Sequence, residues 1–127
     1  MTIEYNVSQN GLRIDTFPKG VLDTRETINY FGRLKNDKRI KQGAIEIVYF
    51  EYVTDFKLSY LESKEITQNF QEPKTTKMIV ATIFVCESTL EYGIGRMLQT
   101  FHEITNTKHN VLLLRSKSEI EDAIQKI

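Results

Sequence analysis

The sequence predicts a single α/β domain over residues 1–127, in which a mixed, mostly parallel sheet of about five strands packs with four helices in the order ββαβαβαβα. Three observations lead to this class. The run Met78–Cys86 has eight apolar residues and one Thr, and it is rich in β-branched side chains, which favours a strand buried on both faces. Four helix-start signatures, each a Ser or Asp three residues before Glu, follow predicted strands. A chain of 127 residues also suits one domain.

The opening segment is expected to form an antiparallel pair of strands. Residues 3–7 alternate as in a strand, and Leu12, Ile14, Thr16 and Phe17 suggest a second strand. Asn10-Gly11 between them is a strong hairpin signal. Pro18 and Gly20 end the second strand. The pair therefore contributes the first two strands of the predicted sheet.

The first helix is expected to begin at Asp23, with Glu26 completing the start signature. Its apolar stripe consists of Ile28, Phe31 and Leu34. Basic residues gather at and beyond its end, where cations interact favourably with the helix dipole. We interpret this cluster as a solvated helix end, with an anion-binding or partner-binding patch as the alternative; it comprises Arg33, Lys35, Lys38, Arg39 and Lys41.

Gly43–Val53 is predicted to be one aromatic-rich strand whose two faces are both apolar, interrupted only by Glu46. The next helix is expected to begin at Ser59, with Glu62 three residues later. A polar loop containing Pro73 then leads into the central strand, Met78–Cys86.

The central strand is followed by Ser88 and Glu91, which match a capping box at the start of a long helix. The apolar stripe of this helix consists of Leu90, Ile94, Met97, Leu98, Phe101 and Ile104. Val111–Leu114 is a short final strand, and Ser116 is expected to cap the last helix.

The composition limits the classes of partner that the chain is expected to bind. Lys plus Arg and Asp plus Glu number 17 each, so the chain has no net charge, which argues against nucleic-acid binding through phosphate contacts. Near neutrality favours self-association, and a homodimer through an edge strand or the Tyr-rich third strand is one expectation. The longest apolar run is far shorter than the roughly 20 residues that a membrane helix needs, so no membrane insertion is expected. The polar opening MTIEYNVSQN lacks a signal-peptide core, which indicates a cytoplasmic protein.

Motifs for catalysis, cofactors and metals fail at specific positions. Gly93-Ile94-Gly95 lies inside a helix and Leu98 stands where a dinucleotide motif needs its third glycine, so close helix packing is the better interpretation. His102-Glu103 begins like a zinc-protease helix, but Asn106 occupies the second His position. Cys86 is expected to be a buried small hydrophobe. We therefore predict no catalytic residue, no metal site, no cofactor and no enzymatic activity.

Ser59 is the one polar residue placed to accept or bind a phosphate, because helix N-termini stabilise negative charge. With Glu62 three residues later, however, the Ser59 hydroxyl is already explained as a helix cap, and the phosphate or anion site is the alternative to that interpretation.

The whole chain resembles a family of small, uncharacterised bacterial proteins described as STAS-like, which have the fold of anti-sigma factor antagonists. The segments that carry the resemblance are IEIVYFEYVTDFKLS, MIVATIFVC, EYGIGRMLQTF and VLLLRSKSEIEDAI. In that fold the phosphoacceptor lies in an Asp-Ser-(Ser/Thr)-Gly turn, and the matching positions here read Lys57-Leu58-Ser59-Tyr60. The resemblance implies Ser59 as the candidate phosphoacceptor or anion site, in a turn that has lost the Asp and the Gly.

Two functions follow as hypotheses. The first is a regulatory protein–protein interaction module without catalysis, whose protein partner is not identified and which binds near the Ser59 helix. The alternative is a binding protein for a small apolar ligand, held in a pocket between sheet and helices that includes Tyr92, Met97 and Phe101. Ordinary core packing also explains those three side chains.

Overall fold

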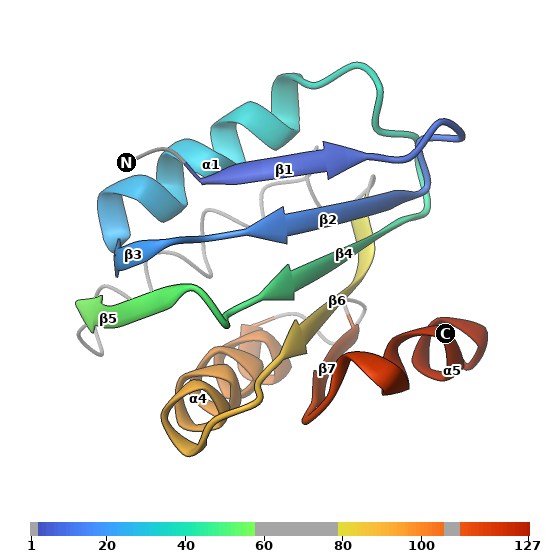
Figure 1. The fold of residues 1–127 in the computed structure, drawn as a ribbon. Helices are drawn as coiled ribbons and strands as arrows, with labels where there is room; N and C mark the ends of the chain where they lie inside the picture. Colours follow the sequence, from blue (N-terminus) through green and yellow to red (C-terminus); the bar gives the residue numbers. More distant parts are fainter. Residues whose placement is uncertain (1–2, 58–78, 106–109) are drawn as a thin grey trace.

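The computed structural model describes residues 3–57, 79–105 and 110–127, and Figure 1 shows their arrangement. The elements in chain order are β1 (Glu4–Val7), β2 (Arg13–Phe17), β3 (Gly20–Asp23), α1 (Thr24–Asn36), β4 (Ala44–Tyr49), β5 (Val53–Lys57), β6 (Ile79–Val85), α4 (Thr89–Thr105), β7 (Asn110–Leu114), the 3₁₀ helix η1 (Lys117–Glu119) and α5 (Ile120–Gln125).

A five-stranded sheet in the order β1-β2-β4-β6-β7 forms the centre of the molecule. β1 pairs with β2 in antiparallel fashion, and the other three pairs are parallel. The expected mixed, mostly parallel sheet of five strands is therefore confirmed, and the expected central strand is β6, between β4 and β7. A second sheet pairs β3 with β5 in parallel, which brings the described strands to seven.

Three α-helices lie in the described ranges, rather than the four expected along the whole chain. The helix expected from Ser59 falls on residues 58–78, which lie outside those ranges. Helices α1 and α4 pack on one face of the five-stranded sheet, where Leu34 and Leu98 contribute to the larger core cluster. The 3₁₀ helix and α5 follow β7, and Ile120 and Ala123 form a smaller core on the opposite face.

The prediction of one strand over Gly43–Val53 is wrong. β4 ends at Tyr49, and a turn closed by the Val53 N–H donating to the Phe50 carbonyl at 3.0 Å separates it from β5. The neighbouring strand breaks at the same level, where Pro18 lacks an amide proton and Gly20 has a φ of 68°. The Gly20 N–H donates to the Tyr52 carbonyl at 3.0 Å. The two neighbouring strands therefore bend at the same level and continue as β3 and β5 of the small second sheet (Figure 1).

The helix starts follow the sequence signals. Asp23 accepts from the Glu26 N–H at 2.9 Å at the start of α1. Ser88 and Glu91 form the reciprocal capping box before α4, with both bonds at 3.1 Å. Ser116 accepts from the Ser118 N–H at 3.2 Å, so this cap begins η1, which leads directly into α5.

Within the described part of the chain, no helix combines the length and the apolar character needed to cross a membrane.

Candidate functional site

Loops that follow β4, β6 and β7 meet at one end of the sheet, because the carboxyl ends of parallel strands lie on the same edge. Ligands of open α/β sheets commonly bind outside this edge. The residues in these loops and in the first turn of α4 are named here the carboxyl-end rim. They are Glu51, Tyr52, Glu87, Leu90, Tyr92, Arg115 and Lys117.

Contacts between the loops order this rim. The Lys117 ammonium pairs with the Glu51 carboxylate across the ends of β7 and β4. The hydrogen bond to Glu51 raises the pKa of Lys117, and the charge of nearby Glu87 acts in the same direction. The Arg115 guanidinium carbon lies 4.6 Å from the centre of the Tyr92 ring, within cation–π range. The rim therefore presents an aromatic ring and a cation in a fixed relative position.

Two large apolar side chains of the rim face solvent. Leu90 in the first turn of α4 is 60% exposed, and Tyr52 in the turn between β4 and β5 is 54% exposed. Neither is needed by the two core clusters. The rim therefore combines two exposed apolar side chains with an ordered Arg–Tyr contact.

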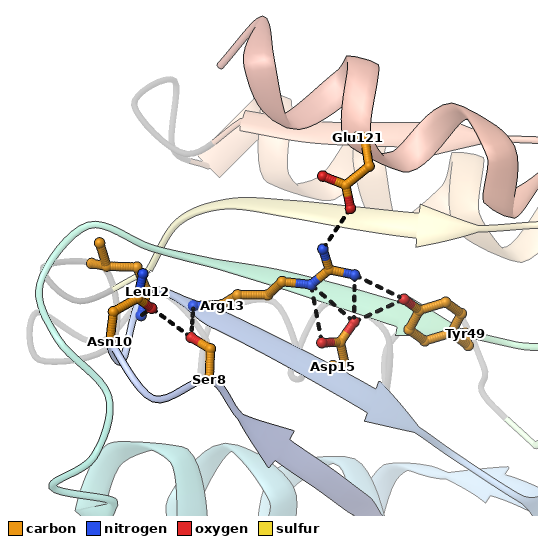
Figure 2. A network of polar contacts seen from close by, with 7 residues as sticks. All are labelled: Ser8, Asn10, Leu12, Arg13, Asp15, Tyr49 and Glu121. Carbon is orange, nitrogen blue, oxygen red and sulfur yellow. Dashed lines mark hydrogen bonds and ion pairs between the residues drawn. The ribbon is translucent and has the colours of Figure 1, made fainter.

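A polar network covers the α5 side of the sheet (Figure 2). Arg13 on β2 binds Asp15 through two nitrogens, with the Nε–Oδ2 distance at 3.0 Å, and donates to Glu121 on α5 at 2.9 Å. Tyr49 on β4 donates to Asp15 at 2.8 Å and stacks on Phe17, with ring centres 4.9 Å apart. Burial, followed by the hydrogen bond to Asp15, raises the pKa of Tyr49 to about 12.

The same figure shows how the β1–β2 turn supports this network (Figure 2). Asn10 Oδ1 accepts from the Leu12 N–H at 3.0 Å, and Ser8 Oγ accepts from the Arg13 N–H at 3.0 Å. Every charged group in the network has a partner within it, so the arrangement attaches α5 to the sheet.

A buried polar cluster lies on the other face, beneath α1. Glu46 on β4 is 2% exposed, accepts from the Thr82 hydroxyl at 2.8 Å and has a short hydrogen bond from the Tyr30 hydroxyl. Thr16 on β2 contacts the same Tyr30 oxygen at 2.6 Å. Burial raises the pKa of the Glu46 carboxyl, whereas the hydrogen bonds from Tyr30 and Thr82 act in the opposite direction.

This cluster forms one wall of a cavity of about 60 Å³ between the sheet, α1 and α4. The described residues that line it are mostly apolar or aromatic and include Leu22, Phe31, Phe50, Phe84 and Leu98. Among the described lining residues, an apolar and aromatic set therefore surrounds one carboxyl group, that of Glu46.

The structure does not bring the sequence-predicted site residues together. Ser59 lies outside the described residues, as does the side chain of Phe101. Tyr92 is half-buried on the rim beside Arg115, and Met97 is half-buried on α4. Neither is among the described residues that line the cavity, where α4 contributes Leu98 instead.

The other features singled out in the sequence have structural explanations. Cys86 is fully buried, as expected, and burial raises its thiol pKa to about 12. In the basic cluster, Arg33 lies over the Tyr5 ring at 5.4 Å and Arg39 pairs with Asp37 at 2.7 Å, which supports the helix-end interpretation. His102 and His109 have side chains outside the described set. Among the described residues, no three His, Cys, Asp or Glu side chains are grouped to hold a metal ion.

Sequence reasoning missed the role of Glu46. It appeared only as an interruption in an apolar strand, although a charged residue on the inward face of a predicted internal strand is itself a signal of a buried polar site. Its partners Tyr30 and Thr82, and Thr16 beside Tyr30, come from three other elements. Their convergence depends on strand register, which the sequence alone does not reveal.

No known protein-family model and no curated protein sequence matches this chain. Solved structures do resemble it. One is an uncharacterised protein of the DUF3478 family with a SpoIIAA-like fold from Shewanella loihica PV-4, with a TM-score of 0.60 and 10% identity, covering 96% of this chain and 91% of the other. Another is the anti-sigma factor antagonist SpoIIAA in its unphosphorylated form, with a TM-score of 0.53 and 10% identity, covering 99% and 100%. The chain therefore has the expected STAS-like, SpoIIAA-like fold.

Proposed function

We propose that this chain is a non-enzymatic regulatory module that binds a protein partner through its carboxyl-end rim. The observation that carries the proposal is the pair of exposed apolar side chains, Leu90 and Tyr52, next to the ordered Arg115–Tyr92 contact. A structure of the same fold is an anti-sigma factor antagonist, which supports a regulatory role. The proposal places the module in the cytoplasm.

The physical case for this surface rests on composition and order. Aromatic residues and Arg are enriched at protein interfaces and supply most of the binding energy there, whereas charged pairs at the margin contribute little. Tyr92 and Arg115 already contact each other, so less conformational entropy is lost when a partner immobilises them. Lys117 and Glu51 form a paired margin beside them.

Site-specific photo-cross-linking in the native host tests this function. A photoreactive amino acid is placed at Leu90, and a matched control is placed at Gln125, an exposed position on α5. We expect one discrete protein adduct from position 90, identified by mass spectrometry and abolished by Arg115→Glu, and no such adduct from position 125. Equal labelling of many proteins from both positions would contradict the proposal.

Ser59 is proposed as the regulated position of this module, on the resemblance to antagonists alone. Intact-mass spectrometry of the protein from its host should show an added phosphate that maps to Ser59. The adduct at position 90 should then differ in yield between Ser59→Asp and Ser59→Ala. Equal yields from both variants would remove the gating and leave the partner-binding proposal intact.

A second candidate function, small-ligand binding, is favoured by the cavity next to Glu46. Its volume of about 60 Å³ is well below the roughly 300–1,000 Å³ of typical drug-sized ligand pockets, so any occupant of this cavity is small. Native mass spectrometry of the protein from its host should retain a non-covalent adduct that denaturation releases. A bare mass under gentle conditions would argue against this candidate.

A further inference from the structure

We infer that the cavity beneath α1 binds the ammonium group of a short primary amine, with Glu46 as the counter-charge. The inference rests on the second candidate function, ligand binding in this cavity, and does not depend on the rim. The observation that carries it is a buried carboxyl group that faces an apolar, aromatic cavity without a cationic partner among the described residues.

Glu46 is the kind of residue that folded proteins rarely bury unpaired. A carboxylate transferred from water into an apolar interior is strongly destabilised unless a cation or several hydrogen-bond donors compensate. Here the described contacts are two hydroxyl groups, those of Tyr30 and Thr82, and neither carries a positive charge. Arg39, near the end of α1, pairs with Asp37 instead of Glu46.

The hydroxyl protons of the cluster match an ionised Glu46. Thr82 donates to one carboxylate oxygen, Tyr30 donates to the other, and Thr16 can donate to the Tyr30 oxygen. Three hydroxyl protons then satisfy three contacts. A carboxylate has about four lone-pair positions and only two are used, so acceptor capacity is left for an N–H donor on the cavity side.

The cavity limits the size of the ligand. A cavity needs about 10–15 Å³ of such volume to hold one water molecule, so about 60 Å³ accommodates a group of a few heavy atoms. The aromatic residues Phe31, Phe50 and Phe84 line the same space and suit a small cation with an alkyl tail. Methylammonium and ethylammonium therefore fit in both charge and volume.

Methyl NMR of the full chain tests this inference with ethylammonium chloride as the probe, ethanol as its uncharged isostere and sodium chloride as the ionic-strength control. The reporters are the methyl groups of Val48 and Leu98, which line the cavity, and the exposed Leu12 is the reference. A ligand of three heavy atoms reaches a dissociation constant of about 1 mM at best, so the titration extends to about 50 mM. We expect saturable shifts with ethylammonium and at least tenfold weaker binding of ethanol.

Three variants sharpen the result. Glu46→Gln keeps the size and removes the charge, and it should weaken ethylammonium binding at least tenfold. Leu98→Phe fills the cavity and should abolish binding, whereas Asp55→Asn removes an exposed carboxylate from β5 and should leave binding unchanged. Equal binding of ethylammonium and ethanol to the wild-type protein overturns the inference even where Glu46→Gln fails to fold. An absence of binding by both probes also overturns it, and an adduct of different chemistry in native mass spectrometry would then leave the second candidate function standing.

Discussion

Among the individual residues, Glu46 links the stability of the protein to pH. Its burial raises the carboxyl pKa above the ordinary value of 4.5. Between that value and the raised one, the folded protein binds a proton that the unfolded chain has released. Folding is therefore favoured at the acidic end of this window, and the contribution of Glu46 to the free energy of unfolding decreases as the pH rises through it.

Glu46→Gln should remove this dependence, because the amide does not titrate. We expect the free energy of unfolding of the variant, minus that of the wild type, to increase between about pH 4 and about pH 7. Urea denaturation in amine-free buffers at both pH values measures the difference. A difference that stays constant across this range would show that Glu46 titrates alike in the folded and unfolded states.

Tyr49 tests the network on the opposite face. Its hydroxyl donates to Asp15 at 2.8 Å in a largely buried position. Tyr49→Phe should therefore lower the free energy of unfolding by about 1.5–3 kcal/mol, the usual effect of losing a hydrogen bond to a charged acceptor. Tyr52→Phe, on an exposed ring, should change it by less than about 0.5 kcal/mol. Urea denaturation of the two variants makes the comparison, and equal effects would contradict a specific role for the Asp15 contact.

At the level of secondary-structure elements, the helix starts were predictable from residues close together in the sequence, whereas a strand break that depends on a distant segment was not. The helix starts at Asp23 and Ser88 follow from hydrogen bonds within four residues, and the structure contains those bonds. The break between β4 and β5 could not be seen, because residues 50–53 are as apolar and β-prone as the strand itself. Two hydrogen bonds hold the turn: the one from Val53 to Phe50 within it, and the one from Gly20, in a neighbouring segment, to Tyr52.

The two glycines of α4 differ in the space around them. A methyl group at Gly95 would lie 2.9 Å from Leu113 Cδ2 and 3.0 Å from Cys86 Sγ, whereas one at Gly93 meets nothing within 4 Å. Gly93→Ala should raise the free energy of unfolding by about 0.5–1 kcal/mol, the gain in helix propensity. Gly95→Ala should lower it by about 1 kcal/mol or more, because overpacking outweighs that gain.

Thermal and urea denaturation of the two glycine variants, side by side, provide the measurement. The pair is matched, since both positions lie in one helix and receive the same methyl group. Similar stabilisation by both substitutions would mean that α4 is free to move away from β6 and β7. Close packing of Gly95 would then be wrong as the explanation for this glycine.

For the whole molecule, strand-like apolar segments and helix caps were enough to predict the fold class. The buried cluster around Glu46 was not predictable from the sequence. The Glu46 site depends on which strands are neighbours. Thr82 reaches Glu46 and Thr16 reaches the Tyr30 hydroxyl because β6 and β2 flank β4. The same order bears on self-association. β4 is internal, so its backbone is already paired on both sides and cannot add a strand from a second chain. The two edges of the large sheet are β1 and β7.

The β7 edge is partly closed by a side chain, which leads to a prediction about assembly. The Leu114 carbonyl accepts from the Cys86 N–H on the inner side, so the Val111 carbonyl, three residues earlier, points to the outer side. There it accepts from the Gln99 amide at 2.7 Å.

Exposed strand edges promote pairing between chains, and side chains that occupy them oppose it. Gln99→Ala should therefore increase concentration-dependent self-association, measured by sedimentation velocity, whereas Thr100→Ala on the same helix should not. An unchanged distribution for Gln99→Ala would place any homodimer contact away from the β7 edge.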